Sequence, residues 1–365
     1  MRLQTWRYFD YWLIGAVAVL VIFGVAMIDS AIAGNPELVE ANAVQRQMIF
    51  AGIGFVVVMV VTLFDYHLWP TIGRVLYVVI FIMLAMVTFG GEEAFGAGRW
   101  LTVAGQLIQP SEMAKITIIV LTADFFSRYQ DRIGEIPIII QGALWTLVLV
   151  GLIIVQPDLS TSITLMVIWA AMLFASGLKG KHIALFIVLM LVVMAIGYPF
   201  LADYQKARIT NFLFTDPDAR FGEEYNVNQA LVTIGSGGLL GQGYGQGTQV
   251  QLRFLKVRDT DFIFASVSHE LGFFGTVIMM GLLFFVIYRV LVNARRARDT
   301  FGALVCYGVA TLLAFHTIVN IGMNLKLLPV TGLPLPFISR GGSALLSIML
   351  GIGLVESVAA RQKLS

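Results

Sequence analysis

Charged residues are scarce in this sequence. Asp, Glu, Lys and Arg make up 13% of its 365 residues, against about 25% in a typical soluble domain. Hydrophobic residues make up 58%, and a soluble fold of that composition would leave large apolar patches in water. Lipid accepts apolar side chains on every face of a helix. The shortage of charge therefore excludes an ordinary soluble domain and predicts an all-α polytopic membrane protein.

The sequence also lacks the side chains that several other kinds of site need. Cys306 is the only cysteine, so an intramolecular disulfide is excluded, and we expect a small core residue there. The four histidines, His67, His182, His269 and His316, do not have the spacing of metal ligands. Lys and Arg occur in small groups and not in one stripe, so no nucleic-acid partner is predicted.

Long apolar runs are what the sequence has in abundance. A helix needs about 20 mostly apolar residues to cross a membrane. Ten runs approach or exceed this length, at 11–28, 48–64, 73–90, 110–126, 137–155, 159–177, 183–201, 262–290, 301–323 and 341–359. The fourth run is the weakest, because it carries Glu112 and Lys115 near its start. The first has no convincing small-residue cleavage site, so we expect a permanent span.

The distribution of Lys and Arg predicts how these spans are oriented. With the N-terminus in the cytoplasm, most basic residues of the short connecting segments fall on the cytoplasmic side, as the positive-inside rule requires. Both termini are then cytoplasmic, and 202–261 is a large extracytoplasmic loop between the seventh and eighth spans. Its aromatic and aliphatic residues favour a partly buried, re-entrant or interfacial element over disorder. We interpret 1–365 as a single integral membrane domain.

Polar residues at membrane depth are costly and are functional by default. Here they fall at the outer ends of spans or in outer loops: Arg99, Trp100, Gln109, Ser111, Glu112, Lys115, Gln156, Asp158, Lys206, Arg208, Gln229, Asp259, Asp261, Glu270, Asn320, Lys326, Ser339 and Arg340. Opposite charges alternate along this series. The pattern predicts one polar cavity that opens to the outside, in which carboxylates and cations pair when it is empty.

Asp261 stands where the long loop ends and the eighth span begins. A carboxylate near a helix N-terminus is favoured by the helix dipole, by about 0.3–1 kcal/mol, so a capping role explains it. A role as general base explains it too, because partial desolvation at the bilayer boundary makes a carboxylate more basic. Asp259, two residues earlier, is a rival for the second role.

Three other features have both a structural and a functional interpretation. Residues 109–112 suit a helix start, whereas Lys115 either pairs with Glu112 or contacts a substrate phosphate. Arg99 and Trp100 are either an interfacial anchor or part of a substrate site. The glycine cluster 235–247 is either a tightly turning loop or a substrate-lining one, and it lacks the context of a dinucleotide or nucleotide motif.

Several motifs, in this order, resemble the SEDS family, the shape, elongation, division and sporulation proteins. They are Gly98-Arg99-Trp100-Leu101, Gln109-Pro110-Ser111-Glu112 with Lys115, Gln156-Pro157-Asp158-Leu159, Ser236-Gly237-Gly238 with Gly241 and Gly243, Thr260-Asp261-Phe262-Ile263-Phe264-Ala265, Glu270-Leu271-Gly272, and Leu333-Pro334-Leu335-Pro336-Phe337-Ile338-Ser339 with Gly341-Gly342-Ser343. The stretch 328–332 is more similar to the elongation branch, RodA, than to the division branch, FtsW. The resemblance covers essentially the whole chain.

The resemblance implies a peptidoglycan glycosyltransferase of the bacterial cytoplasmic membrane. Such enzymes polymerise lipid II, a disaccharide-pentapeptide on undecaprenyl pyrophosphate, into β-1,4 glycan strands on the outer face of the membrane. They work with a class B penicillin-binding protein transpeptidase and with other elongation-complex proteins. A divalent cation, Mg²⁺ or Mn²⁺, is left open as a cofactor, and its ligands are unknown.

The family's catalytic aspartate corresponds to Asp261. We expect substrate contacts from the polar residues of the predicted cavity: Arg99, Trp100, Glu112, Lys115, Asp158, Lys206, Arg208, Gln229, Ser236, Ser339 and Arg340. Among them Arg208, Lys115 and Arg99 are the candidate partners of the pyrophosphate. The sequence departs from the family pattern at Lys256, Val257, Asp259, His269 and Arg340. Contacts near the aspartate are therefore expected to differ, with Lys256, Arg258 or Arg340 supplying them.

Two other classes of function remain open at this point. A transporter or lipid II flippase also has buried charges and discontinuous helices. Against it, no inverted repeat is apparent, and the polar residues gather on one side instead of lining a path across the membrane. A pure scaffold for partner proteins would leave the buried charges unexplained.

Overall fold

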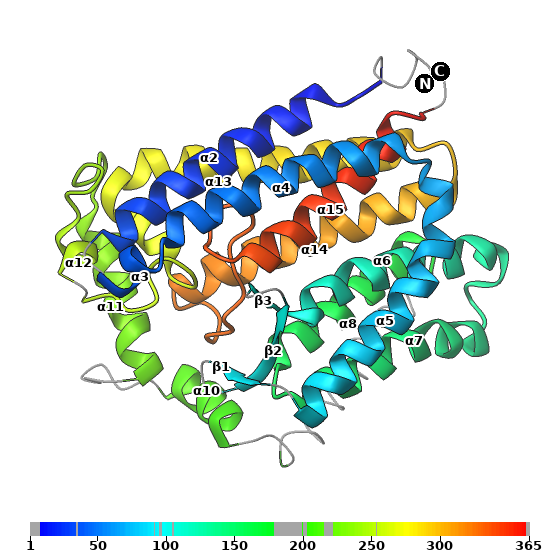
Figure 1. Cartoon of the computed structure of the whole chain (residues 1–365), viewed down its shortest axis with the longest axis horizontal. Helices are drawn as coiled ribbons and strands as arrows, with labels where there is room; N and C mark the ends of the chain where they lie inside the picture. The colour runs from blue at the N-terminus through cyan, green and yellow to red at the C-terminus, as the bar shows by residue number, and fades with distance from the viewer. Residues whose placement is uncertain are drawn as a thin grey trace.

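The computed structural model describes residues 8–33, 36–90, 92–94, 97–103, 106–178, 199, 203–214, 222–252 and 254–362. This part of the chain is mainly helical (Figure 1). The predicted span 183–201 lies outside the described residues, except for residue 199. Each of the other predicted spans is a helix, and the eighth continues beyond its expected end to Arg296.

The helices form two groups that meet along α6 and α14 (Figure 1). The first group consists of α2 (Tyr11–Ile32), α4 (Ala43–Leu63), α13 (Ile263–Arg296), α14 (Thr300–Asn324) and α15 (Gly342–Ala359). The second consists of α5 (Trp69–Gly90), α6 (Pro110–Arg128), α7 (Ile136–Val155) and α8 (Leu159–Ala175). Because α14 packs on α6 and α8 as well as on α13 and α15, it forms the centre of the molecule.

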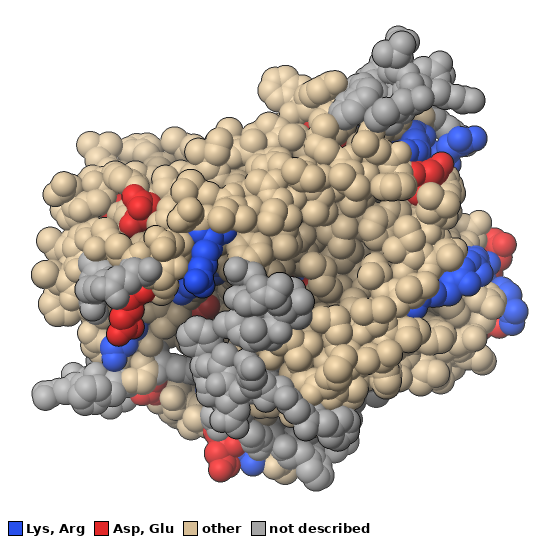
Figure 2. Space-filling view, viewed as in Figure 1, with Lys and Arg blue, Asp and Glu red and all other residues tan. Residues whose placement is uncertain are grey.

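The composition of these helices fits a bilayer. Within the described residues, 7 helical segments are long and apolar enough to cross a membrane: Tyr11–Ile32, Glu37–Leu63, Tyr66–Thr88, Ile136–Val155, Ile263–Arg296, Thr300–Asn324 and Gly342–Ala359. α8 is apolar but shorter, and α6 is a helix with more polar residues. Charged side chains gather toward the two ends of the long axis and leave a broad band without them (Figure 2). The total of ten spans stays a prediction.

The two ends of the bundle carry different structures. α2 begins and α15 ends at one of them, which we call the termini end, and the N–H of Asp10 donates to Glu356 Oε2 there (3.0 Å). We call the opposite end the loop end. It carries α3 (Pro36–Glu40), the segment between α5 and α6, and the segment between α8 and α13 (Figure 1).

The predicted loop 202–261 contains three helices, α10 (Asp203–Leu213), α11 (Gly222–Ser236) and α12 (Thr248–Gln251). Val227 and Ala230 of α11 pack with Leu255, Phe262 and Ala265 in a small apolar core. The segment therefore has a packed core of its own, located where the chain enters α13.

Between α5 and α6 the chain forms a three-stranded antiparallel sheet. Its strands are β1 (Glu92–Ala94), β2 (Ala97–Val103) and β3 (Gln106–Ile108), in the order β1-β2-β3. The prediction of a purely helical fold with an outer loop here is wrong in this detail. The segment is rich in glycine and its strands are short, so the sequence gives little strand signal.

α13 is broken at Gly272, which has a left-handed φ of 66°. The glycine-rich segment after α11 enters this break, because Phe273 N donates to Gly238 O (2.9 Å) and Gly243 N donates to Glu270 O (2.9 Å). A side chain at Gly272 would collide with the backbone of this segment. The glycine cluster thus permits backbone-to-backbone packing, which agrees with the tightly turning interpretation.

Two short 3-10 turns complete the described structure. η1 (Tyr66–Leu68) leads into α5, and η2 (Gln130–Arg132) follows α6. α6 itself begins where the sequence predicts, with Gln109 at the N-cap and Pro110 in the first turn.

Candidate functional site

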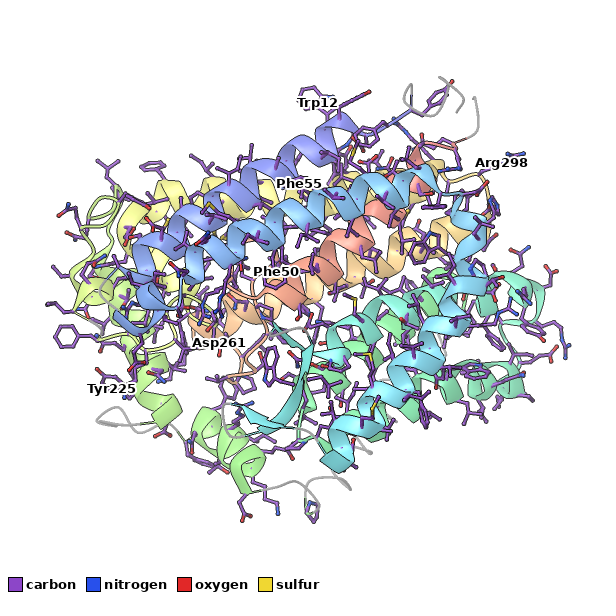
Figure 3. All side chains as sticks on the ribbon, in the orientation of Figure 1. Trp12, Phe50, Phe55, Tyr225, Asp261 and Arg298 are labelled. Carbon is purple, nitrogen blue, oxygen red and sulfur yellow. The ribbon has the colours of Figure 1, made fainter. Side chains whose placement is uncertain are left out.

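Asp261 lies at the loop end, directly before the N-cap residue of α13 (Figure 3). That N-cap residue is Phe262, whose side chain makes no capping hydrogen bond. The side chain of Asp261 is half-buried. Its backbone carbonyl accepts hydrogen bonds from Nδ2 of Asn320 and of Asn324, each at 3.0 Å. The entry to α13 is therefore fixed to the last turn of α14.

The segment 325–341, between α14 and α15, forms a wall beside Asp261. Gly332 has a left-handed φ of 73°, and a Cβ built on it would lie 3.7 Å from Asp261 Oδ2. The carboxylate thus faces backbone that has no side chain, which leaves space next to it. Ser339, a predicted substrate-binding residue, donates its hydroxyl to Thr260 O (2.7 Å) and so holds this wall against the residue before Asp261.

Asp259 and Arg340 form an ion pair near Asp261. Nε of Arg340 binds Asp259 Oδ2, and Arg340 N donates to Asp259 O (2.9 Å). The Asp259 side chain is 8% exposed, whereas that of Arg340 is 30% exposed. Two departures from the family pattern therefore pair with each other. Because its side chain is 8% exposed and paired with Arg340, Asp259 is a poorer candidate than Asp261 for a base that must meet a substrate hydroxyl.

Arg258 and Lys256, which closely precede Asp261 in the sequence, have different surroundings. Arg258 is buried, and its Nε donates to Ala31 O at the end of α2 (2.5 Å). Lys256 is exposed. Arg258 thus fastens this segment to α2 and is not placed to bind a pyrophosphate in this conformation.

Several more residues of the loop end contact the end of α2. Ser30 donates its hydroxyl to Glu270 Oε1 (2.5 Å), and the Tyr244 hydroxyl donates to Ala26 O (2.8 Å). Partial burial and then the nearby Asp29 carboxylate raise the pKa of Tyr244 above its ordinary value. These contacts attach the glycine-rich segment to both α2 and α13.

Asp158 caps α8. It accepts from Thr161 N (3.1 Å) and Thr161 Oγ1 (2.9 Å), and it also accepts from Gln109 Nε2 (3.2 Å) at the start of α6. The hydroxyl of Ser160 donates to Thr331 O (2.5 Å). Through Thr331, the N-terminal ends of α6 and α8 are joined to the wall beside Asp261.

Glu112 and Lys115 pair inside the bundle. Nζ of Lys115 lies 2.7 Å from Glu112 Oε2, and the Lys115 side chain is 0% exposed. Ser347 of α15 also donates to Glu112 Oε2 (3.4 Å). The internal pair, one of the two sequence-based interpretations, is therefore present, and a phosphate contact by Lys115 requires this pair to open.

A pocket lies between α10, α11 and the segment after α14. Its lining residues are Arg208, Asn211, Phe212, Glu224, Val227, Lys326, Leu328, Pro329 and Val330. Lys326 has a left-handed φ of 57°, and its Nζ donates to Asn228 Oδ1 (3.1 Å). Two cations line the pocket against one carboxylate, so it favours an anion. Val330 connects it along the chain to Gly332, beside Asp261.

Two other predicted site residues lie on α11. Gln229 bonds to Gln249 through their side-chain amides. The hydroxyl of Ser236 lies 2.9 Å from His269 Nδ1 in α13. Gln229 therefore joins α11 to α12, and Ser236 joins α11 to α13.

The remaining predicted residues lie in β2 and α10. Trp100 of β2 and Lys206 of α10 are half-buried. Arg99 is part of β2, and its side chain lies outside the described residues. Of the predicted set, Ser339 and Arg340 contact the two residues before Asp261, namely Thr260 and Asp259.

Sequence reasoning missed two members of this site, Asn324 and Gly332. Asn324 follows Asn320 by four residues, a spacing that puts both amides on one face of a helix. That spacing was the available signal. Gly332 gave no signal beyond a turn in a proline-containing segment.

Metal binding has no preformed site in the described residues. No group of three or more His, Cys, Asp or Glu side chains within them is arranged to hold a metal ion. A divalent cation therefore stays a prediction without assigned ligands.

These observations define a multi-pass helical membrane protein with buried polar groups and an anion-favouring pocket gathered at one end. The FtsW/RodA/SpoVE family model, described as cell cycle protein, matches residues 10–364. The chain belongs to this family, and the resemblance found in the sequence is confirmed.

Curated relatives in this family are named as enzymes. The chain is 36% identical to the peptidoglycan glycosyltransferase MrdB of Escherichia coli, over 89% of this chain and 88% of that protein. It is 34% identical to the probable peptidoglycan glycosyltransferase FtsW of Trichlorobacter lovleyi, over 98% of this chain and 94% of the relative. Relatives of both the MrdB and the FtsW type are thus similar to a comparable degree.

Solved structures share the fold. One, from work on structural coordination of polymerization and crosslinking by a peptidoglycan synthase complex, matches with a TM-score of 0.82 and 28% identity over 97% of this chain and 99% of that one. The rod shape determining protein RodA of Thermus thermophilus matches with a TM-score of 0.72 and 27% identity over 98% of each chain.

Proposed function

We propose that this chain, a peptidoglycan glycosyltransferase, polymerises lipid II into β-1,4 glycan strands during cell elongation, with Asp261 as the general base. The observation that carries the proposal is the setting of Asp261. Its side chain is half-buried, and a Cβ built on Gly332 would lie 3.7 Å from its Oδ2, whereas the side chain of Asp259 is only 8% exposed. A general base needs this combination of partial desolvation and space for the hydroxyl that it deprotonates.

The proposed reaction is one inverting displacement. Asp261 takes the proton of the acceptor's 4-hydroxyl while that oxygen attacks the anomeric carbon of the donor sugar. The bond from this carbon to the diphosphate oxygen breaks on the opposite face, so an α-linked donor gives a β-linked product. The electron pair leaves with the diphosphate, which is a good leaving group, so the reaction needs a base and cations more than a strong acid.

Cations for the diphosphate are available in the pocket at the loop end. Arg208, a predicted pyrophosphate partner, shares this pocket with Lys326, and the planar guanidinium group matches phosphate oxygens. The geometry supports Arg208 better than Lys115, which is engaged by Glu112 inside the bundle. The other proposed substrate residues are Arg99, Trp100, Glu112, Asp158, Lys206, Gln229, Ser236, Ser339 and Arg340.

The proposed setting is the cytoplasmic membrane, with ten spans, both termini inside and the loop end outside. Basic residues at the termini end, such as Arg289, Arg295 and Arg361, agree with that orientation. The lipid tails of the substrate would enter sideways from the bilayer. A class B penicillin-binding protein transpeptidase is the proposed partner, because a structural relative comes from a complex that coordinates polymerization and crosslinking.

The test is polymerisation of lipid II by purified Asp261→Asn protein. We expect a loss of about 10²–10⁴-fold, the usual contribution of a general base. Asp203→Asn, which neutralises an exposed aspartate of α10 at the same end, is the matched control and should retain activity. Normal glycan strands from the Asp261→Asn protein on a gel would overturn the proposal.

A second measurement addresses the flippase alternative. Purified protein in vesicles that contain labelled lipid II should form glycan strands without moving the lipid between leaflets. Transbilayer movement in the absence of any polymer, with the partner transpeptidase present, would favour the flippase.

A further inference from the structure

We propose that Asn320 and Asn324 are positioning residues for Asp261: their side-chain amides hold its backbone carbonyl and thereby aim its carboxylate. This inference rests on the proposed function, in which Asp261 is the base. The asparagines themselves would not touch the substrate.

The hydrogen bonds of the two amides converge on one carbonyl. The asparagines are four residues apart on α14, so they project from the same face of the helix. Each Nδ2 donates to Asp261 O at 3.0 Å, which uses both acceptor positions of that oxygen. The second N–H of Asn320 donates to Leu333 O (2.8 Å), and that of Asn324 donates to Asn320 O (2.8 Å). All four donors are used, and both side chains are 0% exposed.

This arrangement fixes the base and the wall that it faces. Holding the carbonyl of Asp261 restricts rotation of its backbone, and that rotation would also swing its side chain. Asn320 also donates to the backbone carbonyl of Leu333, the residue that follows Gly332. A Cβ built on Gly332 would lie 3.7 Å from Asp261 Oδ2. One amide therefore sets the spacing between the carboxylate and its wall, where an acceptor hydroxyl has to fit.

Helix packing alone gives a weak reason for two amides at this depth. A buried amide is unfavourable unless its hydrogen bonds are made, and polar contacts between membrane helices contribute little to stability on average. Asn324 also has a capping role, because its Oδ1 accepts from Ala265 N (3.2 Å) in the first turn of α13. Asn320 contacts this entry through the carbonyl of Asp261 and gives the cleaner test.

The experiment separates turnover from substrate binding. Asn320→Leu should lower kcat for lipid II polymerisation about tenfold or more, as misplacement of a reacting group does, with KM within about twofold of wild type. In the inactive Asp261→Asn background, the same change should leave the affinity for lipid II unaltered. Thr317→Val, which removes a buried hydroxyl one turn earlier on α14, is the matched control and should alter neither quantity.

Three outcomes would overturn the inference. One is a folded Asn320→Leu protein with wild-type kcat. Another is a parallel loss of lipid II affinity in the Asp261→Asn background, because the amide would then shape a binding pocket. The third is a failure of both Asn320→Leu and the smaller Asn320→Ala to fold, judged by thermal unfolding, because the role would then be structural. Polymerisation by Asp261→Asn alone would instead remove the proposed function.

Discussion

The two ends of the bundle both bury polar groups, but they use them differently. At the termini end, carboxylates are neutralised by donors from other helices. Asp10 accepts from Arg289 Nη2 (2.8 Å) and from Asn293 Nδ2 (2.8 Å), both on α13. At the loop end, the side chains of the two asparagines and of Ser339 donate hydrogen bonds to backbone carbonyls. The carboxylate of Asp261 faces Gly332.

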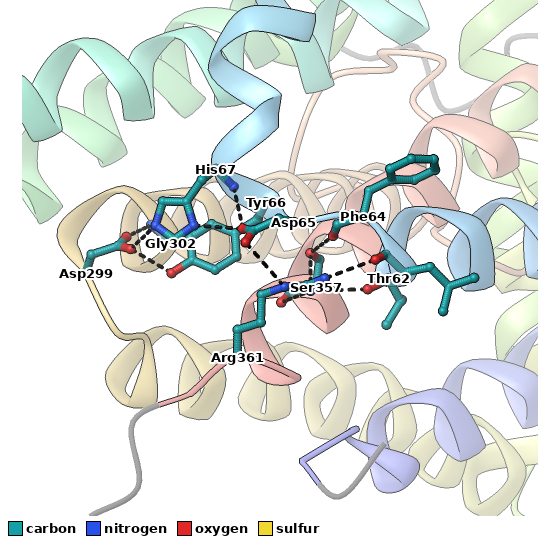
Figure 4. Close-up of polar contacts among 10 residues, drawn as sticks. Thr62, Phe64, Asp65, Tyr66, His67, Asp299, Gly302, Ser357 and Arg361 are labelled. Atoms are coloured by element: carbon teal, nitrogen blue, oxygen red, sulfur yellow. Dashed lines mark hydrogen bonds and ion pairs between the residues drawn. The ribbon is translucent and has the colours of Figure 1, made fainter. Parts of the chain in front are cut away.

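A second cluster at the termini end also joins elements that are distant in the sequence (Figure 4). His67 lies between two carboxylates, 2.7 Å from Asp65 and 2.8 Å from Asp299. Arg361 donates to Thr62 O (3.2 Å) and so ties the end of α15 to the end of α4. The comparison indicates that polar groups at the termini end join helices, whereas at the loop end some of them, the two asparagines and Ser339, in addition hold the backbone at Thr260 and Asp261. Changes at the two ends should therefore have different consequences.

The largest difference in turnover is expected between the alanine variants of two glycines that have a left-handed backbone conformation. Gly332 has φ 73° and lies beside Asp261, whereas Gly177 has φ 104° after α8, with nothing within 4 Å of a Cβ built on it. Alanine costs roughly 1–2 kcal/mol of backbone strain at either position. Gly332→Ala should also place a methyl group in contact with the Asp261 carboxylate, where the acceptor hydroxyl has to fit, and lower turnover about 10²-fold. Gly177→Ala should retain turnover in the same lipid II assay, and equal losses in both variants would break the comparison.

Smaller effects are expected when the two arginine–aspartate pairs are broken, mainly on stability for one pair and on turnover for the other. Arg289→Gln removes the cation from Asp10, whose side chain is 2% exposed, and breaking a buried pair costs up to about 3–5 kcal/mol. Its main effect should be a lower Tm in detergent. Arg340→Gln releases Asp259 beside the base and should lower turnover about tenfold, the equivalent of one hydrogen bond to a charged group.

The paired assays decide whether the two ends really differ. Tm and polymerisation are measured on both variants and on the wild type. If Arg340→Gln lowers Tm more than Arg289→Gln does, or if Arg289→Gln alone reduces turnover with its fold intact, then the assignment of stability to one end and activity to the other is wrong.

Sequence reasoning predicted those parts of the fold that local patterns control. Apolar runs identified the helices, and Pro110 marked a helix start that the structure confirms. The sheet around β2 was missed, because glycine-rich strands of this length carry no clear alternation. Contacts between segments that are distant in the sequence were not predictable either. Residues 259 and 340 are far apart in the chain, and their ion pair depends on how the segment after α14 folds back.

The candidate site was predictable in its residues more than in its arrangement. The motif at 260–265 singled out Asp261, and the Glu112–Lys115 pair followed from helical spacing. The role of Asn324 was not predictable, because it depends on a backbone carbonyl. Every residue has such a carbonyl, so the sequence does not indicate which one accepts the hydrogen bond. The same reason applies to the hydrogen bond that Ser339 donates to Thr260 O, whereas the substrate contact expected of Ser339 stays a prediction.

The smallest expected effect is a pH dependence of the thermal stability that arises at the termini end. Burial raises the pKa of Asp299, but hydrogen bonds from Gly302 N, Tyr66 and His67 outweigh burial, so its pKa lies below the ordinary value of 3.8. A lowered pKa means that Asp299 stabilises the fold above pH 3.8 and that this stabilisation is lost as the pH falls through the folded-state value. Asp299→Asn should therefore lower Tm slightly at neutral pH, and the difference from wild type should shrink in acid.

The exposed Asp203 supplies the control for this last measurement. Asp203→Asn, which changes an exposed side chain of α10, should leave Tm near the wild-type value at both neutral and acid pH. Polymerisation at neutral pH should stay near the wild-type rate in Asp299→Asn, since no contact of Asp299 in the described residues reaches the loop end. A folded Asp299→Asn protein without activity would show that the termini end also controls the chemistry, and the division between the two ends would have to be abandoned.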